Sequence, residues 1–99
     1  MYAIEGTIQG SVYPAPVPPF APARAVVSFD KQSATVGTVD ITYKARGMAD
    51  AHTPADNQFD VTGTQRQFEL IGGDVGSVIL TPAGLDSAVK YRIAYHAVL

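Results

Sequence analysis

The chain has 99 residues, of which 46% are hydrophobic and only 16% are charged, and its formal net charge at pH 7 is −2. This length supplies one hydrophobic core and not two, so we expect a single domain over residues 1–99. The seven basic residues are scattered singly and the net charge is negative, which excludes nucleic acids and anionic membranes as expected partners.

The chain has no cysteine, its N-terminus has no basic segment followed by an apolar one, and no apolar run approaches the roughly 18 residues of a membrane span. We therefore expect a protein made in the cytoplasm without a signal peptide. A surface that is low in charge is also easier to bury against another protein, because desolvating ions is costly.

The first residues alternate between apolar and polar side chains. The apolar side chains that share one parity are Tyr2, Ile4, Ile8 and Val12. Polar side chains occupy the other parity, and glycines fill the remaining positions. This alternation predicts a strand over residues 2–12 with one solvent-facing side, bent at its glycines.

Residues 13–24 form a proline-rich segment that contains five of the seven prolines. Proline lacks the N–H that a sheet requires, so we expect this segment to be extended and outside any sheet interior. Two interpretations stay open: a stiff crossover between two strands, or an arm that lies on a neighbouring molecule and uses Val17 and Phe20 as anchors. The candidate interface residues of such an arm are Tyr13, Pro14, Val17, Pro19 and Phe20.

Short predicted strands follow, separated by turn signals. They lie near residues 25–29, 38–44, 59–61, 68–70, 78–80 and 89–99. The segment 78–80 is predicted to be buried, and residues 45–57 are predicted to be the longest loop. With about seven strands in all and no helical period, the pattern is typical of an all-β protein. We expect a small antiparallel β-sandwich with Greek-key connections.

The stretch from Leu85 to Tyr91 resembles the tyrosine corner of fibronectin type III and related Ig-like domains. In that motif a leucine precedes the penultimate strand, and a tyrosine six residues later opens it and bonds back to the backbone. The resemblance implies an Ig-like sandwich. The chain departs from the family in having no tryptophan and in ending at Leu99, where a final strand would follow. Either the N-terminal strand 2–12 fills that edge, or the chain is a different sandwich. A missing final strand would also leave an open edge for a partner chain to complete.

Titratable side chains form no catalytic constellation in the sequence. There is no cysteine nucleophile and no Gly-x-Ser-x-Gly motif. His52 lies in the predicted loop with Asp50 and Asp56, but this spacing matches neither an EF-hand nor a closed zinc site, so a solvated loop is favoured. We expect no enzymatic activity, no metal and no cofactor. The candidate recognition residues of this loop are Arg46, Met48, Asp50 and His52.

A cysteine-free small β domain with a weakly charged surface and an extended proline-rich segment is similar in overall design to the proteins that decorate or cement bacteriophage capsids. The resemblance implies a non-enzymatic structural protein of the virion that binds capsid or other assembly subunits. It is also compatible with a homo-oligomer, for which a trimer is favoured. The alternative is an Ig-like carbohydrate- or protein-binding module of a phage tail or a cell-surface protein.

Overall fold

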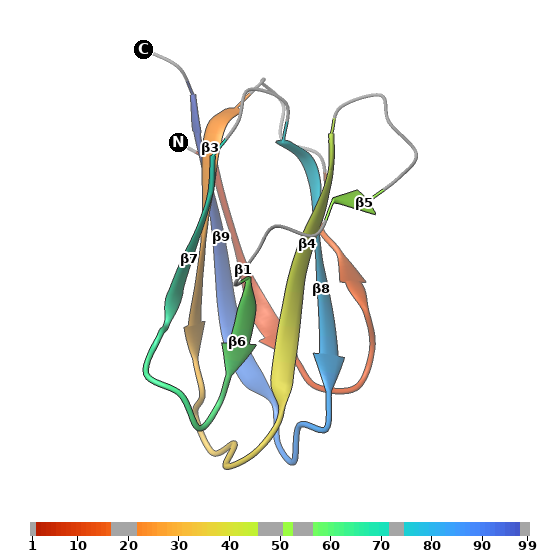
Figure 1. Ribbon diagram of the computed structural model, residues 1–99, viewed down its shortest axis with the longest axis vertical. Coiled ribbons are helices and arrows are strands. Elements are labelled where there is room, and N and C mark those ends of the chain that lie inside the picture. The colour runs from red at the N-terminus through yellow and green to blue at the C-terminus, as the bar shows by residue number, and fades with distance from the viewer. Residues whose placement is uncertain (1, 17–21, 46–50, 53–56, 72–74, 98–99) are drawn as a thin grey trace.

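The computed structural model describes residues 2–16, 22–45, 51–52, 57–71 and 75–97, and within them it contains strands and no helix (Figure 1). In particular, these residues include no helix that could cross a membrane. The strands are β1 (Tyr2–Ile8), β2 (Tyr13–Pro14), β3 (Pro22–Asp30), β4 (Thr38–Ala45), β5 (Ala51–His52), β6 (Gln58–Asp60), β7 (Gln67–Ile71), β8 (Val75–Ala83) and β9 (Val89–Ala97).

These strands form two antiparallel sheets. The first sheet has the order β1-β9-β3-β7, and the second has the order β2-β8-β4-β5, with β6 also beside β4. Consecutive strands usually lie in different sheets, since the chain passes from β1 to β2 and from β3 to β4 across the molecule (Figure 1). Neighbours in sequence therefore mostly face each other across the core instead of pairing in one sheet.

The all-β, antiparallel prediction is confirmed, but the predicted number of strands was too low. The described residues contain nine strand segments, of which β5 and β6 pair with one edge of β4 at different heights. These two segments share one position, so each sheet has four strand positions. The sequence missed β2 and β5 because a two-residue strand has too few side chains to display alternation.

The core lies between the two sheets and consists of side chains from both. Phe29 of β3 stacks on Phe59 of β6, with ring centroids 4.5 Å apart and planes inclined by 6°. Tyr13 of β2 lies against Tyr91 of β9, with centroids 5.0 Å apart. Both contacts join the first sheet to the second, so the sheets pack face to face. The largest fully buried side chains are Tyr95, Phe59, Phe68, Ile41, Leu70, Leu80, Ile93, Val27, Val39, Val78 and Val89.

Apolar and polar residues alternate in 38–44 and in 89–99, which predicts one inward side for each strand. That inward side is confirmed, although Ala94, on the predicted outward side of β9, is also buried. In β4, Val39 and Ile41 are fully buried, as expected for the inward parity. In β9, Val89 and Ile93 are buried in the same way. Residues 98–99 of that predicted strand lie outside the described residues. The period of two thus identifies the core-facing side of both strands.

The N-terminal strand is shorter than predicted. Its alternation holds only as far as Ile8, where β1 ends, and the chain then turns toward the second sheet. Val12, which the parity placed inside, is 56% exposed. β1 pairs with β9 along its whole length, from Tyr2 opposite Tyr95 to Ile8 opposite Val89. The N-terminal strand therefore occupies the sheet position beside the last strand, which is the first of the two alternatives left open.

The prediction that residues 13–24 lie outside any sheet interior holds at the start of the segment, where β2 is an edge strand, and is wrong at its end, where β3 is an inner strand. At its start, Tyr13 pairs with Leu80, and the Ala15 N–H donates to the Val78 carbonyl at 2.8 Å. At its end, Pro22 begins β3, and a first strand position tolerates a missing N–H. The segment connects the second sheet to the first, as a crossover would, and residues 17–21 lie outside the described residues.

A carboxylate joins two loops at one end of the molecule. Asp86, between β8 and β9, accepts a hydrogen bond from the Thr35 N–H at 2.8 Å and another from the Thr35 hydroxyl. It also accepts one from the Val36 N–H at 3.3 Å. The donors on Thr35 lower the pKa of Asp86, because they stabilise the ionised carboxylate. The loop between β3 and β4 is thereby tied to a loop 50 residues later in the chain.

We expect acid to release this tie. The pKa of Asp86 is lower in the folded protein than its ordinary value of 3.8, so its contribution to the free energy of unfolding is present above that value. The contribution is lost as the pH falls through the folded pKa. The difference in Tm between the wild type and Asp86→Asn should therefore be largest near neutral pH and should shrink toward pH 2. A difference that stays constant over this range would contradict the assignment.

Candidate interaction surface

Of the five predicted interface residues, the structure describes two, and these two point in different directions. Tyr13 points into the molecule, where burial and a hydrogen bond with Tyr13 raise the pKa of Tyr91 to about 12. Tyr13 is therefore part of the packing between the sheets and is only partly exposed, and its role in an interface stays a prediction. Pro14 is exposed on the outer side of β2. The other three predicted residues, which lie outside the described residues, are Val17, Pro19 and Phe20.

The predicted recognition loop is also not placed as a unit. His52 belongs to β5 and pairs with Tyr43, so residues 45–57 are not one continuous loop. The remaining predicted residues, which lie outside the described residues, are Arg46, Met48 and Asp50. Among the described residues, no group of three or more His, Cys, Asp or Glu side chains is placed to hold a metal ion.

The described surface most suited to contact another protein is the outer face of the second sheet. In β8, Leu80 points inward and is fully buried, so Ile79 points outward, where it remains partly exposed. The register places Pro14 on one side of Ile79 and Thr42 on the other. We call this surface the β2-β8-β4 face, defined by Val12, Pro14, Thr42, Ile79 and Thr81.

Two charged residues of β4 border this face on its outer side. Asp40 lies opposite Thr81 and accepts a hydrogen bond from Gln58 Nε2 at 2.7 Å, and Lys44 lies opposite Ser77 near the end of β4. The five residues that define the β2-β8-β4 face are all uncharged. Cores of protein interfaces are depleted in charge for the same reason, because burying an ion requires removing its water.

The outer face of the first sheet has a different character. Arg92 lies 3.4 Å from Glu5, and Arg24 lies 3.5 Å from Glu69, with all four side chains well exposed. The charges of such exposed pairs are solvated, and covering them with a partner would desolvate both charges of each pair. Of the two faces, the one formed by β2, β8 and β4 is the easier to bury.

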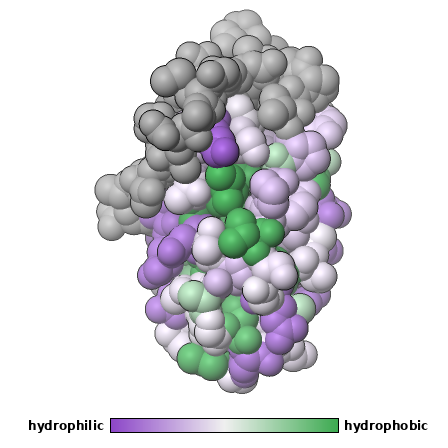
Figure 2. All heavy atoms as spheres, turned by 90° about the vertical axis from the view of Figure 1, so that its right-hand side faces the viewer, coloured by the Kyte–Doolittle hydropathy of each residue, from purple (hydrophilic) through white to green (hydrophobic). Residues whose placement is uncertain are grey.

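Figure 2 looks at this side of the molecule, which lies on the right in Figure 1. Hydrophobic surface occurs in patches along the middle of the view, with hydrophilic surface beside it. Val12 and Val36 are the two large hydrophobic residues that are strongly exposed among the described ones, at 56% and 53%. Val36 belongs to the loop before β4, so Val12 is the exposed valine of this face.

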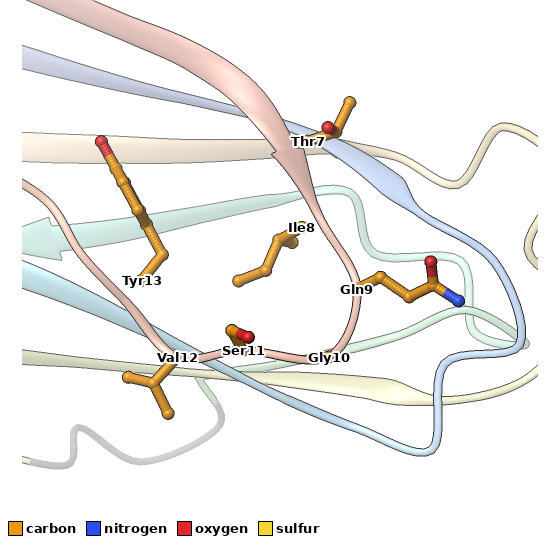
Figure 3. Close-up of a pocket in the computed structure, with 7 residues that line it drawn as sticks. All are labelled: Thr7, Ile8, Gln9, Gly10, Ser11, Val12 and Tyr13. Atoms are coloured by element: carbon orange, nitrogen blue, oxygen red, sulfur yellow. The ribbon is translucent and has the colours of Figure 1, made fainter.

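A small hollow lies beneath the turn that presents Val12. Its volume is about 250 Å³, and it is lined by residues 7–13 (Figure 3). Tyr13 and Val12 point in opposite directions: Tyr13 points toward the core, and Val12 points away from it. Small-molecule sites usually have volumes above about 300 Å³ and enclose most of their ligand. The turn is therefore better suited to present an apolar side chain than to enclose a ligand.

Sequence reasoning missed the two apolar residues of this face. Ile79 was placed in a wholly buried strand, because the run Val78-Ile79-Leu80 has no polar member to reveal an outer side. Val12 was placed inside because it shares the parity of Ile8. The pair Gly10-Ser11 favours a turn and was the available signal that the strand ends before it.

No sequence family, no characterised protein and no solved structure matches this chain.

Proposed function

We propose that this chain is a non-enzymatic structural protein that docks on other protein subunits through the β2-β8-β4 face. In its most specific form, the proposal is a decoration or cement protein of a bacteriophage capsid. The observation that carries the proposal is the uncharged surface around Val12 and Ile79. The exposed Pro14 joins these two residues, since it follows Val12 by two positions and pairs with Ile79. Covering such a surface across subunit boundaries would stabilise an assembled particle by mass action.

The order of the strands supports a particular kind of sandwich. Each sheet has four positions, in the orders β1-β9-β3-β7 and β2-β8-β4-β5. Successive strands alternate between the two sheets, except that β4, β5 and β6 all belong to the second one. We infer a jelly roll, which consists of eight strands in two Greek keys and recurs in viral capsid and lectin domains. An Ig-like sandwich instead places strands one, two, four and five of the chain in one sheet. The inferred fold is compatible with both functions considered, and function must be decided at the surface.

The resemblance of Leu85–Tyr91 to a tyrosine corner is accordingly local. The Tyr91 hydroxyl is hydrogen-bonded with Tyr13, and a Cβ placed on Gly6 would lie 2.6 Å from it. The connection before β9 is held by Asp86 in place of the tyrosine. The stretch therefore favours a β-sandwich in general and no longer favours the Ig-like family.

The proline-rich segment remains part of the proposed interface. Val17, Pro19 and Phe20 follow directly in sequence on the exposed residues Pro14 and Pro16. A deletion of the whole segment would also remove the hydrogen bonds that Ala15 makes with β8 and the first residue of β3. Single substitutions such as Phe20→Ser are therefore the better test of this segment.

The experiment is co-sedimentation of the purified protein with assembled particles whose capsid genes neighbour its own. We expect Val12→Lys to weaken binding by about tenfold or more, because a lysine in the interface would have to be desolvated. Val36→Lys is the matched control, since it adds the same charge at an equally exposed valine outside the face. Phe20→Ser is expected to weaken binding in the same assay.

Equal binding by both lysine variants would contradict the assignment of the face. Failure of the wild type to bind particles, together with binding to glycans on an array, would instead support the carbohydrate-binding alternative. Unchanged Tm values for the lysine variants would establish that any loss of binding does not come from unfolding.

A further inference from the structure

β1 is the least protected sheet edge among the described strands. It has seven residues and no proline, and β9 is its one described partner. The other edges are shorter: β7 has five residues, β6 has three, and β2 and β5 have two each, with Pro14 in β2. Short strands and prolines are devices by which proteins prevent an edge from pairing with another chain. β1 has neither of them, and Glu5 is its one charged residue.

The hydrogen bonds of the first sheet determine which way its backbone groups face. The Phe29 N–H donates to the Arg66 carbonyl at 2.9 Å, on the side of β3 where β7 lies. Backbone groups alternate in direction along a strand, so those of Ser28 face β9. Ser28 lies opposite Arg92, and the backbone groups of Arg92 therefore face β3.

The same alternation identifies the free groups of β1. The neighbours of Arg92 in β9 face β1, and one of them, Ile93, lies opposite Ile4. The even-numbered residues of β1 therefore bond to β9, and the odd-numbered residues direct their N–H and C=O groups away from it. These outward-facing residues are Ala3, Glu5 and Thr7.

We propose that this edge pairs with the β1 edge of a second copy of the chain, antiparallel and around a two-fold axis. The outward groups of each copy then bond to the same kind of groups in the other, as an isologous contact requires. Two four-position sheets would become one continuous eight-stranded sheet. The pairing is independent of the proposed docking face, which lies on the other sheet.

Charge and burial select the register of this pairing. An axis at Glu5 would place two carboxylates directly opposite each other, which is destabilising. An axis at Ile4 places Glu5 opposite Ala3 of the second copy. Tyr2 and Ile4 are only partly buried, whereas Ile8 is 5% exposed, so this register covers the end of β1 that still has apolar surface to bury. It also places Tyr2 opposite Gly6 of the second copy, where the ring covers a position without a side chain.

Cysteine cross-linking tests the register directly, since the chain has no cysteine of its own. With the axis at Ile4, the two Ile4 residues form a non-hydrogen-bonded pair, whose Cα atoms are about 4.5 Å apart and within disulfide range. We expect Ile4→Cys to give a disulfide-linked dimer on mild oxidation. Glu5→Cys is expected to give little, because that residue faces Ala3. Efficient linking by Glu5→Cys alone would overturn the register.

Proline substitutions test the edge itself. Ala3→Pro removes an outward N–H and leaves the bonds between β1 and β9 intact. Gln67→Pro is the matched control on β7, at the other edge of the same sheet, because Arg66 bonds to β3 and its neighbour Gln67 therefore faces outward. Light scattering after size exclusion should find dimers for the wild type and Gln67→Pro, and monomers for Ala3→Pro at the same concentration. Circular dichroism should find all three folded.

A monomeric wild type, a wild-type trimer, or an Ala3→Pro variant that remains dimeric would each overturn the proposal. A trimer is the outcome expected from the resemblance to capsid decoration proteins, and a closed two-fold contact cannot produce it. Val12→Lys separates this inference from the proposed docking function, since it should impair particle binding and leave the dimer unchanged.

Discussion

Replacing Gly37 by alanine is expected to destabilise the protein by about 3 kcal/mol or more. The φ angle of Gly37 is 121°, a conformation that residues with a Cβ rarely adopt. An added Cβ would also lie 2.6 Å from Leu85 Cα and 2.7 Å from Leu85 N, and these backbone atoms cannot rotate away. The substitution would therefore push apart the two loops that Asp86 holds together. Equilibrium unfolding in urea measures the loss.

Alanine substitutions at two other glycines separate the cost of backbone strain from the cost of the contact with Leu85. Gly84 has a φ of 67° with no atom near the added Cβ, so Gly84→Ala should cost only about 1–2 kcal/mol from backbone strain. Gly10 has open space around it and no positive φ, so Gly10→Ala should change stability little. If Gly37→Ala proves no more costly than Gly84→Ala, the contact with Leu85 is not as tight as described.

Phe59→Ala is expected to cost about 3–5 kcal/mol, the range for removing a buried phenylalanine ring. Phe59 is fully buried and stacked on Phe29, and the Arg66 guanidinium lies 5.3 Å from its ring centroid. Truncation would leave a cavity between the sheets and remove the cation–π contact. β6 has only three residues, so the packing of Phe59 adds to the few backbone bonds that join this strand to β4.

Chemical denaturation of Phe59→Ala beside Phe59→Leu measures this contribution. The leucine variant keeps much of the volume and should lose clearly less stability than the alanine variant. Val12→Ala is a surface control, for which a change within about 0.5 kcal/mol is expected. A loss of less than about 1 kcal/mol for Phe59→Ala would contradict the packing described between β3 and β6.

The two proposals use separate surfaces of one small domain, the docking face and the β1 edge. The docking face belongs to the second sheet and presents Val12 and Ile79. The edge belongs to the first sheet and presents the backbone of β1. A dimer formed through β1 would carry two copies of the docking face, and two linked contacts with one assembly bind more tightly than either contact alone.

Local patterns in the sequence were sufficient to predict the fold class and the inner side of the long strands. Val39 and Ile41 in β4, and Val89 and Ile93 in β9, are buried as their alternation predicted. The prediction succeeds because successive side chains of any strand point to opposite faces, whichever strands lie beside it. Composition likewise predicted a weakly charged surface, since only 16% of the residues are charged.

The neighbours of each strand were decided only by the tertiary structure. The alternation of β1 reveals a buried side but does not reveal that Tyr2 pairs with Tyr95, at the other end of the chain. The proline content of residues 13–24 predicted a position outside any sheet interior, whereas Pro22 begins an inner strand. Proline prevents donation of one hydrogen bond and leaves its neighbours free to pair.

The residues of the candidate interaction surface were also decided only by the tertiary structure. Val12 and Ile8 share a parity, and they end on opposite sides because the chain turns between them and joins a different sheet. Ile79 became a surface residue because Val78 and Leu80 took the inner side of β8. By itself, the sequence determined an all-β domain with a weakly charged surface. Burial depends on which strands lie beside a residue, so only the tertiary structure decided which apolar side chains remain available to a partner.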